Sequence, residues 1–142
     1  MIYLAAPLFN PIEREFNTRL KNAIRYPVYL PQEDGLLLTD LLSRGVDTAE
    51  AIRTIFAADL VALNSSRMLV AILNGPHVDS GVAFEIGYFR SLSRPIIGFH
   101  TDARSELPIG FNPMIAGALE EVAAGEDELI LAIEKLYPRA KV

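Results

Sequence analysis

The stretch from Met68 to Phe89, MLVAILNGPHVDSGVAFEIGYF, predicts a fold class and the position of a site within it. Its first six residues form a continuous apolar run, typical of a strand buried in a parallel sheet, and Asn-Gly-Pro then ends that strand. Asp79-Ser80-Gly81 opens a helix, and Glu85 lies about one turn inside it among apolar neighbours. A carboxylate in apolar surroundings is costly unless it has a use, and ligands of open α/β sheets bind at the carboxyl ends of the strands. We therefore predict an active site with two acids six positions apart, Asp79 and Glu85.

The composition limits the class of protein. The 142 residues are 51% hydrophobic and 22% charged, which predicts one compact domain, residues 1–142, with a substantial core. The net charge of -5 argues against a nucleic-acid partner, which would require a basic face. The chain has no cysteine, and His77 and His100 are too few for a typical zinc site, so we expect no metal and no cofactor. No apolar run approaches the roughly 20 residues of a membrane span and no basic signal-peptide start is present, which favours a cytoplasmic protein without a membrane partner.

Apolar runs alternate with helical periodicity along the chain. Strands are expected at Ile2 to Ala6, Pro27 to Leu30, Met68 to Leu73 and Pro95 to Phe99, and the segment from Met114 to Ala123 fits a helical turn followed by a short edge strand. Helices are expected at Pro11 to Arg25, Asp47 to about Ala62, Gly81 to Leu92 and Glu126 to Leu136, with a further helical turn in the connection from Pro31 to Gly45. This alternation predicts an α/β fold: a single-domain three-layer sandwich with an about five-stranded parallel sheet, flavodoxin-like or Rossmann-like.

Three of these helices carry apolar stripes, and in the last helix the stripe consists of Leu129, Ile130, Ile133 and Leu136. In the first helix, one stripe repeats every four residues: Ile12, Phe16, Leu20 and Ile24. The helix after Asp47, with Glu50 three positions on as in a capping box, is expected to turn five apolar residues inward: Ile52, Ile55, Phe56, Leu60 and Leu63. No glycine-rich dinucleotide or P-loop motif follows a strand, so nothing indicates a nucleotide cofactor.

Three segments in chain order carry a resemblance to a known family. They are IYLAAPLFN at 2–10, PQEDG at 31–35 and DSGVAFEIGY at 79–88, and together they resemble nucleoside 2-deoxyribosyltransferases over most of the chain. Enzymes of this family cleave the N-glycosidic bond of a 2′-deoxynucleoside and pass the sugar to another nucleobase through a covalent deoxyribosyl-enzyme on a glutamate. The resemblance implies 2′-deoxynucleosides and free nucleobases as partners, and a homo-oligomer that is hexameric or dimer-based.

The resemblance implies catalytic roles for Glu85, Tyr3 and Asp59. Retaining glycosyl transfer needs one carboxylate as nucleophile, here Glu85, and another group to protonate the leaving group. The helix N-terminus favours the ionised form of Glu85, whereas burial opposes it. Tyr3 is implied to hydrogen-bond and orient Glu85, although an ordinary core tyrosine of the strand is an equal interpretation. Asp59, twenty positions before Asp79, is implied to serve the leaving base as proton donor or hydrogen-bond partner, and a solvated surface aspartate is the alternative.

The same resemblance implies a substrate-binding set. Asp79 is implied to contact the sugar 3′-hydroxyl in addition to capping its helix, and Ser80 and Gly81 open that helix beside it. Gln32 is implied to read the edge of the base, because an amide can both donate and accept. Phe9 is a candidate to stack on the base, with plain core packing as the alternative.

Further features concern a neighbouring subunit and departures from the family pattern. Members of the family borrow a residue, often an asparagine, from a neighbour to bind the 5′-hydroxyl, and Asn112 in GFNPM is the nearest match. The long polar loop from Thr101 to Pro113 is expected to pack, with Met114 to Leu119, against that neighbour. Many relatives have Asp-Gly where this chain has Asn74-Gly75, and His77 in the same loop is interpreted as a solvated rim residue.

Two other functions remain open on the same fold. A hydrolase of deoxynucleoside 5′-monophosphates would need a phosphate site at the loop after the first strand, which here is Ala-Pro-Leu-Phe-Asn, with no basic residue. A non-enzymatic nucleotide-binding module would have no need for Tyr3, Asp59, Asp79 and Glu85 to converge.

Overall fold

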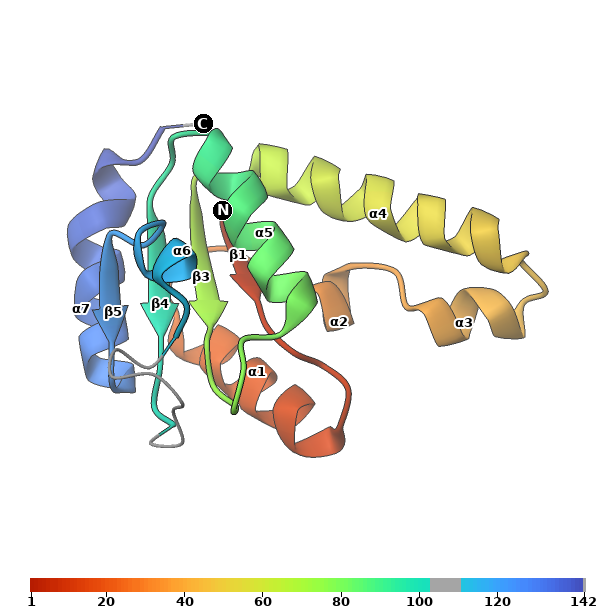
Figure 1. Cartoon of the computed structure of the whole chain (residues 1–142), viewed down its shortest axis with the longest axis horizontal. Helices are drawn as coiled ribbons and strands as arrows, with labels where there is room; N and C mark the ends of the chain where they lie inside the picture. The colour runs from red at the N-terminus through yellow and green to blue at the C-terminus, as the bar shows by residue number, and fades with distance from the viewer. Residues whose placement is uncertain (103–110, 142) are drawn as a thin grey trace.

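A computed structural model of the chain describes residues 1–102 and 111–141. Its strands form one parallel sheet in the order β2-β1-β3-β4-β5 (Figure 1). The strands are β1 (Ile2–Ala5), β2 (Val28–Tyr29), β3 (Met68–Ile72), β4 (Ile96–Phe99) and β5 (Glu121–Ala123). The predicted α/β sandwich is therefore confirmed. The carboxyl ends of all the strands share one edge, and the strand order reverses between β1 and β3, where open α/β sheets bind ligands.

The helices follow the predicted alternation. They are α1 (Pro11–Ala23), α2 (Pro31–Asp34), α3 (Leu38–Ser43), α4 (Thr48–Ser65), α5 (Ser80–Ser91), α6 (Pro113–Ala116) and α7 (Glu126–Leu136), followed by the 3-10 helix η1 (Tyr137–Arg139). α7 has the predicted bounds, and α6 with β5 confirms the expected turn and edge strand. The predicted polar loop before α6 falls largely on residues 103–110, outside the described residues.

Side chains at the helix starts explain several of these boundaries. Asn10 and Glu13 form a capping box at α1, because the Asn10 side chain accepts from the Glu13 backbone N–H at 3.0 Å and the Glu13 carboxylate accepts from the Asn10 N–H at 3.2 Å. Pro11 occupies the first helical position, where a missing N–H costs nothing. Asp47 caps α4 by accepting from the N–H groups of Ala49 and Glu50. These caps fix where α1 begins after β1 and where α4 begins at the outer end of the connection from α3 (Figure 1).

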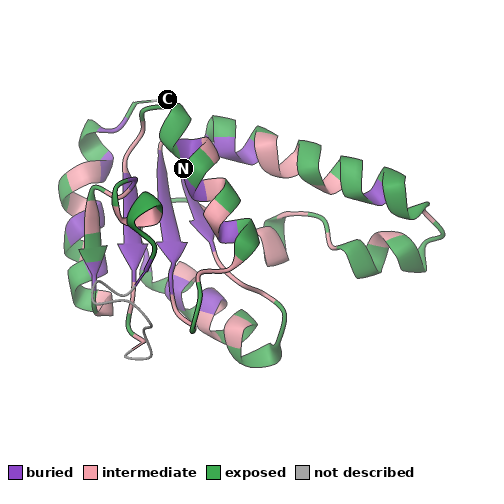
Figure 2. Cartoon of the chain, viewed as in Figure 1, coloured by how far each residue is buried: buried purple, intermediate pink, exposed green. Residues whose placement is uncertain are grey.

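The sheet separates two apolar cores. Helices α1 and α7 cover one face through Leu20, Ile24, Leu129 and Ile133, and the last two confirm the predicted apolar side of α7. Helix α5 and the end of α4 cover the other face through the buried residues Leu63, Val82, Ile86 and Phe89. The three central strands β1, β3 and β4 are buried along their whole length, whereas the outer strands β2 and β5 are only partly buried (Figure 2). Tyr3 belongs to the core on the α5 side, where it places a hydroxyl among apolar side chains.

The predicted inward orientation of α4 is wrong for two residues. Ile52 is 56% exposed and Phe56 is 51% exposed, whereas Leu63 is buried as predicted. Figure 1 shows the reason: only the end of α4 packs on the sheet, and its first part runs outward together with α3. We call residues 38–65 the α3–α4 arm. Ile12 is also 80% exposed, because the first turn of α1 extends beyond the sheet edge and leaves the predicted stripe without a partner there.

Within the described residues, no helix combines the length and the apolar character that crossing a membrane requires.

Candidate functional site

A hydrogen bond between Tyr3 and Glu85 lies at the centre of the candidate site. The Tyr3 hydroxyl donates to Oε1 of Glu85 at 2.5 Å, across 82 positions of sequence. Tyr3 comes from β1 and is fully buried, and Glu85 comes from α5, which packs on the same face of the sheet. The two residues implied by the resemblance to interact are therefore in direct contact. The burial of Tyr3 fixes the position from which its hydroxyl reaches the carboxylate.

The surroundings of Glu85 hold its carboxyl close to its point of half-ionisation at neutral pH. Burial raises the pKa of Glu85 to about 7, and the hydrogen bond from Tyr3 opposes this rise by lowering the pKa. The negative charges of Asp59 and Asp79 add to the rise. Burial, Glu85 and Asp59 together raise the pKa of Tyr3, so the phenol stays protonated and acts as a donor. Perturbed carboxyls of this kind are typical of functional sites.

Asp59 and Asp79 both precede Glu85 in the chain, and their charges act on its carboxyl. Asp59 is half-buried on α4, and burial raises its pKa. Asp79 caps α5, because its Oδ1 accepts from the N–H groups of Gly81 at 2.9 Å and Val82 at 3.1 Å. The capping role of Asp79 is thus confirmed. The second oxygen of the same carboxylate has acceptor sites of its own.

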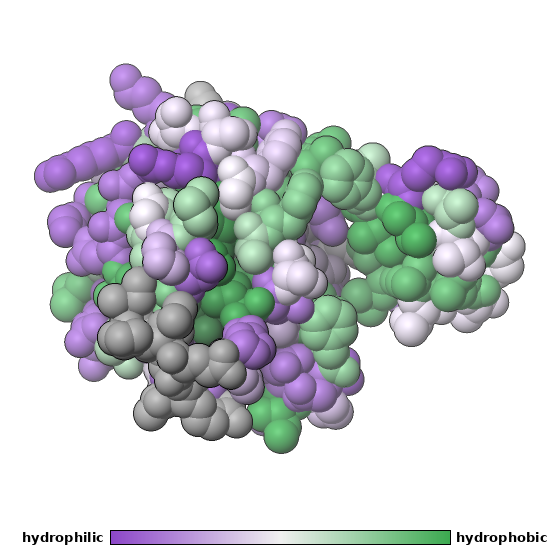
Figure 3. Space-filling model, viewed as in Figure 1, coloured by the Kyte–Doolittle hydropathy of each residue, from purple (hydrophilic) through white to green (hydrophobic). Residues whose placement is uncertain are grey.

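An apolar cleft opens over Glu85 between the arm and α5. Its volume is about 400 Å³, and it is lined by residues of α3, α4 and α5: Leu38, Ile52, Ile55, Phe56, Asp59, Leu60, Leu63, Gly81, Phe84 and Glu85. Figure 3 shows apolar surface on the arm where it faces the rest of the protein. Asp59 and Glu85 are the charged groups in this lining, so the cleft presents two carboxyls to anything that enters it. Sites for small organic ligands have this character, with mostly apolar walls and few polar groups.

The remaining predicted residues do not all meet at the cleft. Ser80 and Gly81 form the first turn of α5, and Gly81 lines the cleft. Phe9 is 75% exposed in the connection between β1 and α1. Asn112 caps α6 by accepting from the Met114 N–H at 2.8 Å, on an exposed part of the surface.

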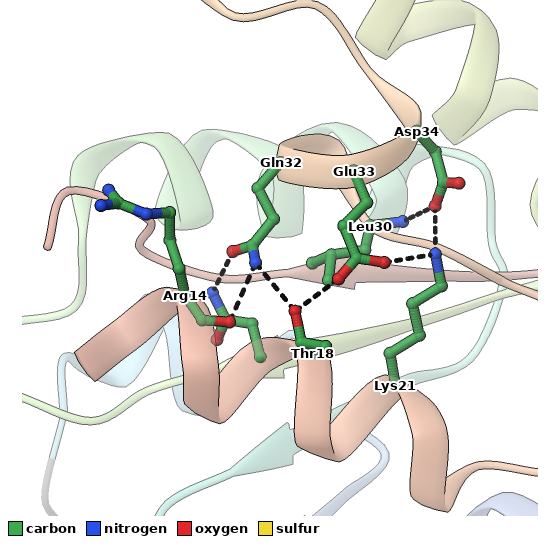
Figure 4. A network of polar contacts seen from close by, with 8 residues as sticks. Arg14, Thr18, Lys21, Leu30, Gln32, Glu33 and Asp34 are labelled. Carbon is green, nitrogen blue, oxygen red and sulfur yellow. Dashed lines mark hydrogen bonds and ion pairs between the residues drawn. The ribbon is translucent and has the colours of Figure 1, made fainter. Parts of the chain in front are cut away.

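Gln32 lies in a polar network that ties α2 to α1 (Figure 4). Its Oε1 accepts from Asn17 Nδ2 at 3.0 Å, and its Nε2 donates to the Arg14 carbonyl at 2.9 Å and to the Thr18 hydroxyl at 3.2 Å. Asn17 is itself buried and also donates to the Pro7 carbonyl. Both donor hydrogens of the Gln32 amide are therefore engaged within the protein.

The structure adds residues that sequence patterns did not single out. Leu38, Ile52, Phe56 and Phe84 form walls of the cleft, although the helical pattern assigned Ile52 and Phe56 to the core. Tyr29 of β2 lies beside Tyr3, with ring centroids 5.4 Å apart. A sequence signal for this pair exists, because IYLA and PVYL are strands that each carry one tyrosine among apolar residues.

The raised pKa of Glu85 makes a prediction about stability. The pKa of Glu85 in the folded state, about 7, exceeds the ordinary value of 4.5. As the pH rises between these values, the unfolded chain ionises Glu85 more readily than the folded protein does, so the free energy of unfolding decreases. Glu85→Gln keeps an acceptor for Tyr3 but carries no charge. Relative to the native protein, the variant should gain on the order of 2–3 kcal/mol of unfolding free energy between about pH 5 and pH 8. Denaturant unfolding at both pH values tests this, and a stability difference independent of pH would contradict it.

Comparisons with known proteins identify relatives of this chain in sequence and in fold. The family model for nucleoside 2-deoxyribosyltransferase matches residues 2–126. A conserved protein from Enterococcus faecalis V583 has a similar crystal structure, with a TM-score of 0.76 and 26% identity over 94% of this chain and 96% of that chain. The 2-deoxyribosyltransferase from the psychrotolerant bacterium Bacillus psychrosaccharolyticus shares the fold, with a TM-score of 0.73 and 22% identity over 91% of this chain and 89% of that chain. No curated protein sequence matches. Since the family model covers most of the chain, the protein belongs to the nucleoside 2-deoxyribosyltransferase family.

Proposed function

We propose that this protein transfers the 2-deoxyribosyl group of a 2′-deoxynucleoside to another nucleobase, with retention, through a covalent intermediate on Glu85. The observation that carries the proposal is the Tyr3–Glu85 hydrogen bond, because the carboxyl that it holds lines an apolar cleft. Family membership supports the same general activity.

The proposed reaction has two steps that mirror each other. In the first, Glu85 attacks C1′ of the sugar, the bond from C1′ to the base nitrogen breaks, and the base takes a proton from Asp59. In the second, a nitrogen of the incoming base attacks C1′, the ester to Glu85 breaks, and Asp59 recovers a proton. The raised pKa of Asp59 supports this assignment, because a carboxyl that holds a proton more tightly is a better store for it near neutral pH.

Tyr3 serves this mechanism as an orienting donor. Its hydrogen bond lowers the pKa of Glu85 against the effect of burial, and so maintains an ionised fraction able to attack. The same contact holds one carboxylate oxygen, which restricts the direction from which the other approaches the sugar.

The substrate contacts are proposals of the same kind. Asp79 is assigned to the 3′-hydroxyl, with Ser80 and Gly81 beside it at the start of α5. Phe9 is assigned to base stacking, and its exposure leaves the ring available to a ligand. Asn112 is assigned to the 5′-hydroxyl bound by a neighbouring subunit. A role for Gln32 at the base edge requires that its amide exchange its bonds to α1 for bonds to the ligand.

A hydrolase of deoxynucleoside 5′-monophosphates is the second candidate, and one contact favours it. Arg14 Nη1 donates to the Leu8 carbonyl at 3.0 Å, so a cation lies against the loop after β1 that has no basic residue in its own sequence. A guanidinium at that position is suited to binding a phosphate.

Incubation with deoxyinosine and free adenine tests the proposed function against both alternatives. A transferase forms deoxyadenosine, a monophosphate hydrolase leaves the free nucleoside intact but releases hypoxanthine from deoxyinosine 5′-monophosphate, and a binding module converts neither. Product analysis by liquid chromatography distinguishes the three outcomes, and absence of deoxyadenosine would refute transfer between these bases.

We further predict that the active form is an oligomer. Large apolar side chains lie half-exposed on the arm and α5, among them Leu38, Ile52, Phe56 and Phe84, and such a patch is typical of an interface. Light scattering across a dilution series should detect an oligomer, and specific activity should fall where it dissociates. A fully active monomer would contradict the shared site and the role of Asn112.

A further inference from the structure

We propose that Tyr29 is a positioning residue, whose ring holds Tyr3 in the orientation that hydrogen-bonds Glu85. The inference rests on the proposed function, since it concerns how the nucleophile is aligned. It assigns to the edge strand β2, which is two residues long, a part in the site built on β1 and α5.

The sheet register places the two tyrosines side by side. Tyr3 of β1 pairs with Tyr29 of β2 in a parallel ladder, so both side chains point to the same face of the sheet. Their rings are stacked, with centroids 5.4 Å apart and planes inclined by 23°. Tyr3 is fully buried and its hydroxyl is 2.5 Å from Glu85, so a rotation of its ring would displace that hydrogen bond. Tyr29 blocks the side of the ring that faces the sheet edge.

Gly35 supports Tyr29 at its hydroxyl end. A Cβ at position 35 would lie 3.0 Å from the Tyr29 hydroxyl and 2.6 Å from the Pro31 carbonyl oxygen. The backbone φ of Gly35 is -99°, so close approach, rather than an unusual conformation, excludes a side chain there. The glycine of the PQEDG segment therefore makes room for the Pro31 carbonyl of α2 and, beside it, for the Tyr29 hydroxyl.

The polar network of Figure 4 fixes the helix that carries this support. Lys21 of α1 contacts Glu33 at 3.0 Å and Asp34 at 2.7 Å, and Asp34 also accepts from the Leu30 N–H at 2.8 Å. Gln32 adds the contacts to α1 already described. Contacts thus hold α2 on α1, and Gly35 directly after α2 lies beside the Tyr29 hydroxyl, whose ring stacks on Tyr3.

The surroundings of Tyr29 favour a role in positioning Tyr3 over a direct part in the proposed transfer. No hydrogen bond involves its hydroxyl among the residues that the structure describes, and Tyr29 is absent from the lining of the cleft. Burial and the charges of Asp59, Asp34 and Glu85 raise its pKa, so it remains neutral. The ring is therefore the part of the side chain that we expect to matter.

The test combines variants at position 29 with two readouts. Tyr29→Leu should lower kcat by roughly 10- to 100-fold and change KM by less than about twofold, since alignment and not binding is affected. It should also raise the pKa of the Glu85 carboxyl, followed by carbon-13 NMR titration without substrate, because the hydrogen bond that lowers this pKa weakens. Tyr29→Phe keeps the ring, so its kcat and its Glu85 pKa should both equal those of the native protein.

Gly35→Ala tests the same contact from the other side and should also raise the pKa of Glu85. Gly125→Ala is its matched control, because a Cβ there meets nothing within 4 Å. If Tyr29→Leu does not fold, Gly35→Ala decides. An unchanged Glu85 pKa in the folded variants, or a Phe variant as impaired as the Leu variant, would overturn the proposal. A native protein that transfers no sugar, but whose Glu85 pKa still responds to these variants, would refute the proposed function and leave the positioning role standing.

Discussion

Replacing Glu85 should abolish deoxyribosyl transfer. Glu85→Ala removes the proposed nucleophile, and Glu85→Gln keeps the shape and the acceptor for Tyr3 but cannot form the proposed ester. We expect both to lower kcat by roughly 10⁴-fold or more, the scale found when a covalent nucleophile is lost. Initial-rate measurements with deoxyinosine and adenine give this directly, and circular dichroism verifies the fold.

A control and a chemical trap make the assignment specific. Glu15→Gln changes an exposed carboxylate on α1 and should leave the rate unchanged. A slow 2′-fluoro donor should leave a sugar adduct on Glu85 of the native protein, detectable by mass spectrometry of its peptides. An adduct on another residue, or near-native turnover by the alanine variant, would refute the role of Glu85.

Removing the Tyr3 hydroxyl should have the second-largest effect. Tyr3→Phe leaves the buried ring in place, so stability should change little, but kcat should fall by roughly 10- to 1000-fold. In the native protein, the hydrogen bond from Tyr3 lowers the pKa of Glu85, which is about 7. Loss of this bond in the variant should therefore raise the pKa of Glu85 further. A smaller fraction of Glu85 is then ionised at neutral pH, and the acid limb of the pH–rate profile shifts to higher pH.

Tyr26→Phe is the matched control for this variant. Tyr26 accepts from Arg25 and pairs with the Tyr137 ring on the opposite core, so loss of its hydroxyl should affect neither kcat nor the pH profile. If Tyr3→Phe keeps full kcat with an unshifted acid limb, Tyr3 is a core tyrosine without a part in catalysis.

Sequence patterns predicted the elements of this fold because periodicity and capping are local properties. The run before Asn74 and the repeat in α7 identify a strand and a helix without knowledge of what they contact. The orientation of Ile52 and Phe56 could not be predicted in this way. A helical stripe shows which residues share a face of the helix. Whether that face is buried depends on the direction in which α4 runs relative to the sheet, which the stripe does not indicate.

The same distinction applies to the site. Tyr3 and Glu85 were identified from motifs, and their contact depends on β1 and α5 sharing one face of the sheet. The amide of Gln32 bonds to α1, and the ring of Tyr29 stacks on Tyr3. Both arrangements depend on tertiary packing, which single-residue chemistry does not encode.

The brevity of the two outermost strands has a consequence for aggregation. β2 contains two residues and β5 contains three, so the sheet ends on both sides in strands with few open backbone groups. Long open edges are templates on which further chains add strand by strand, and short edge strands are one way in which proteins prevent this. We therefore expect fibre growth from the folded state to be disfavoured at both margins of the sheet. The apolar surfaces of the arm and α5 could then associate with other copies of the chain while the sheet edges remain unsuited to cross-β assembly.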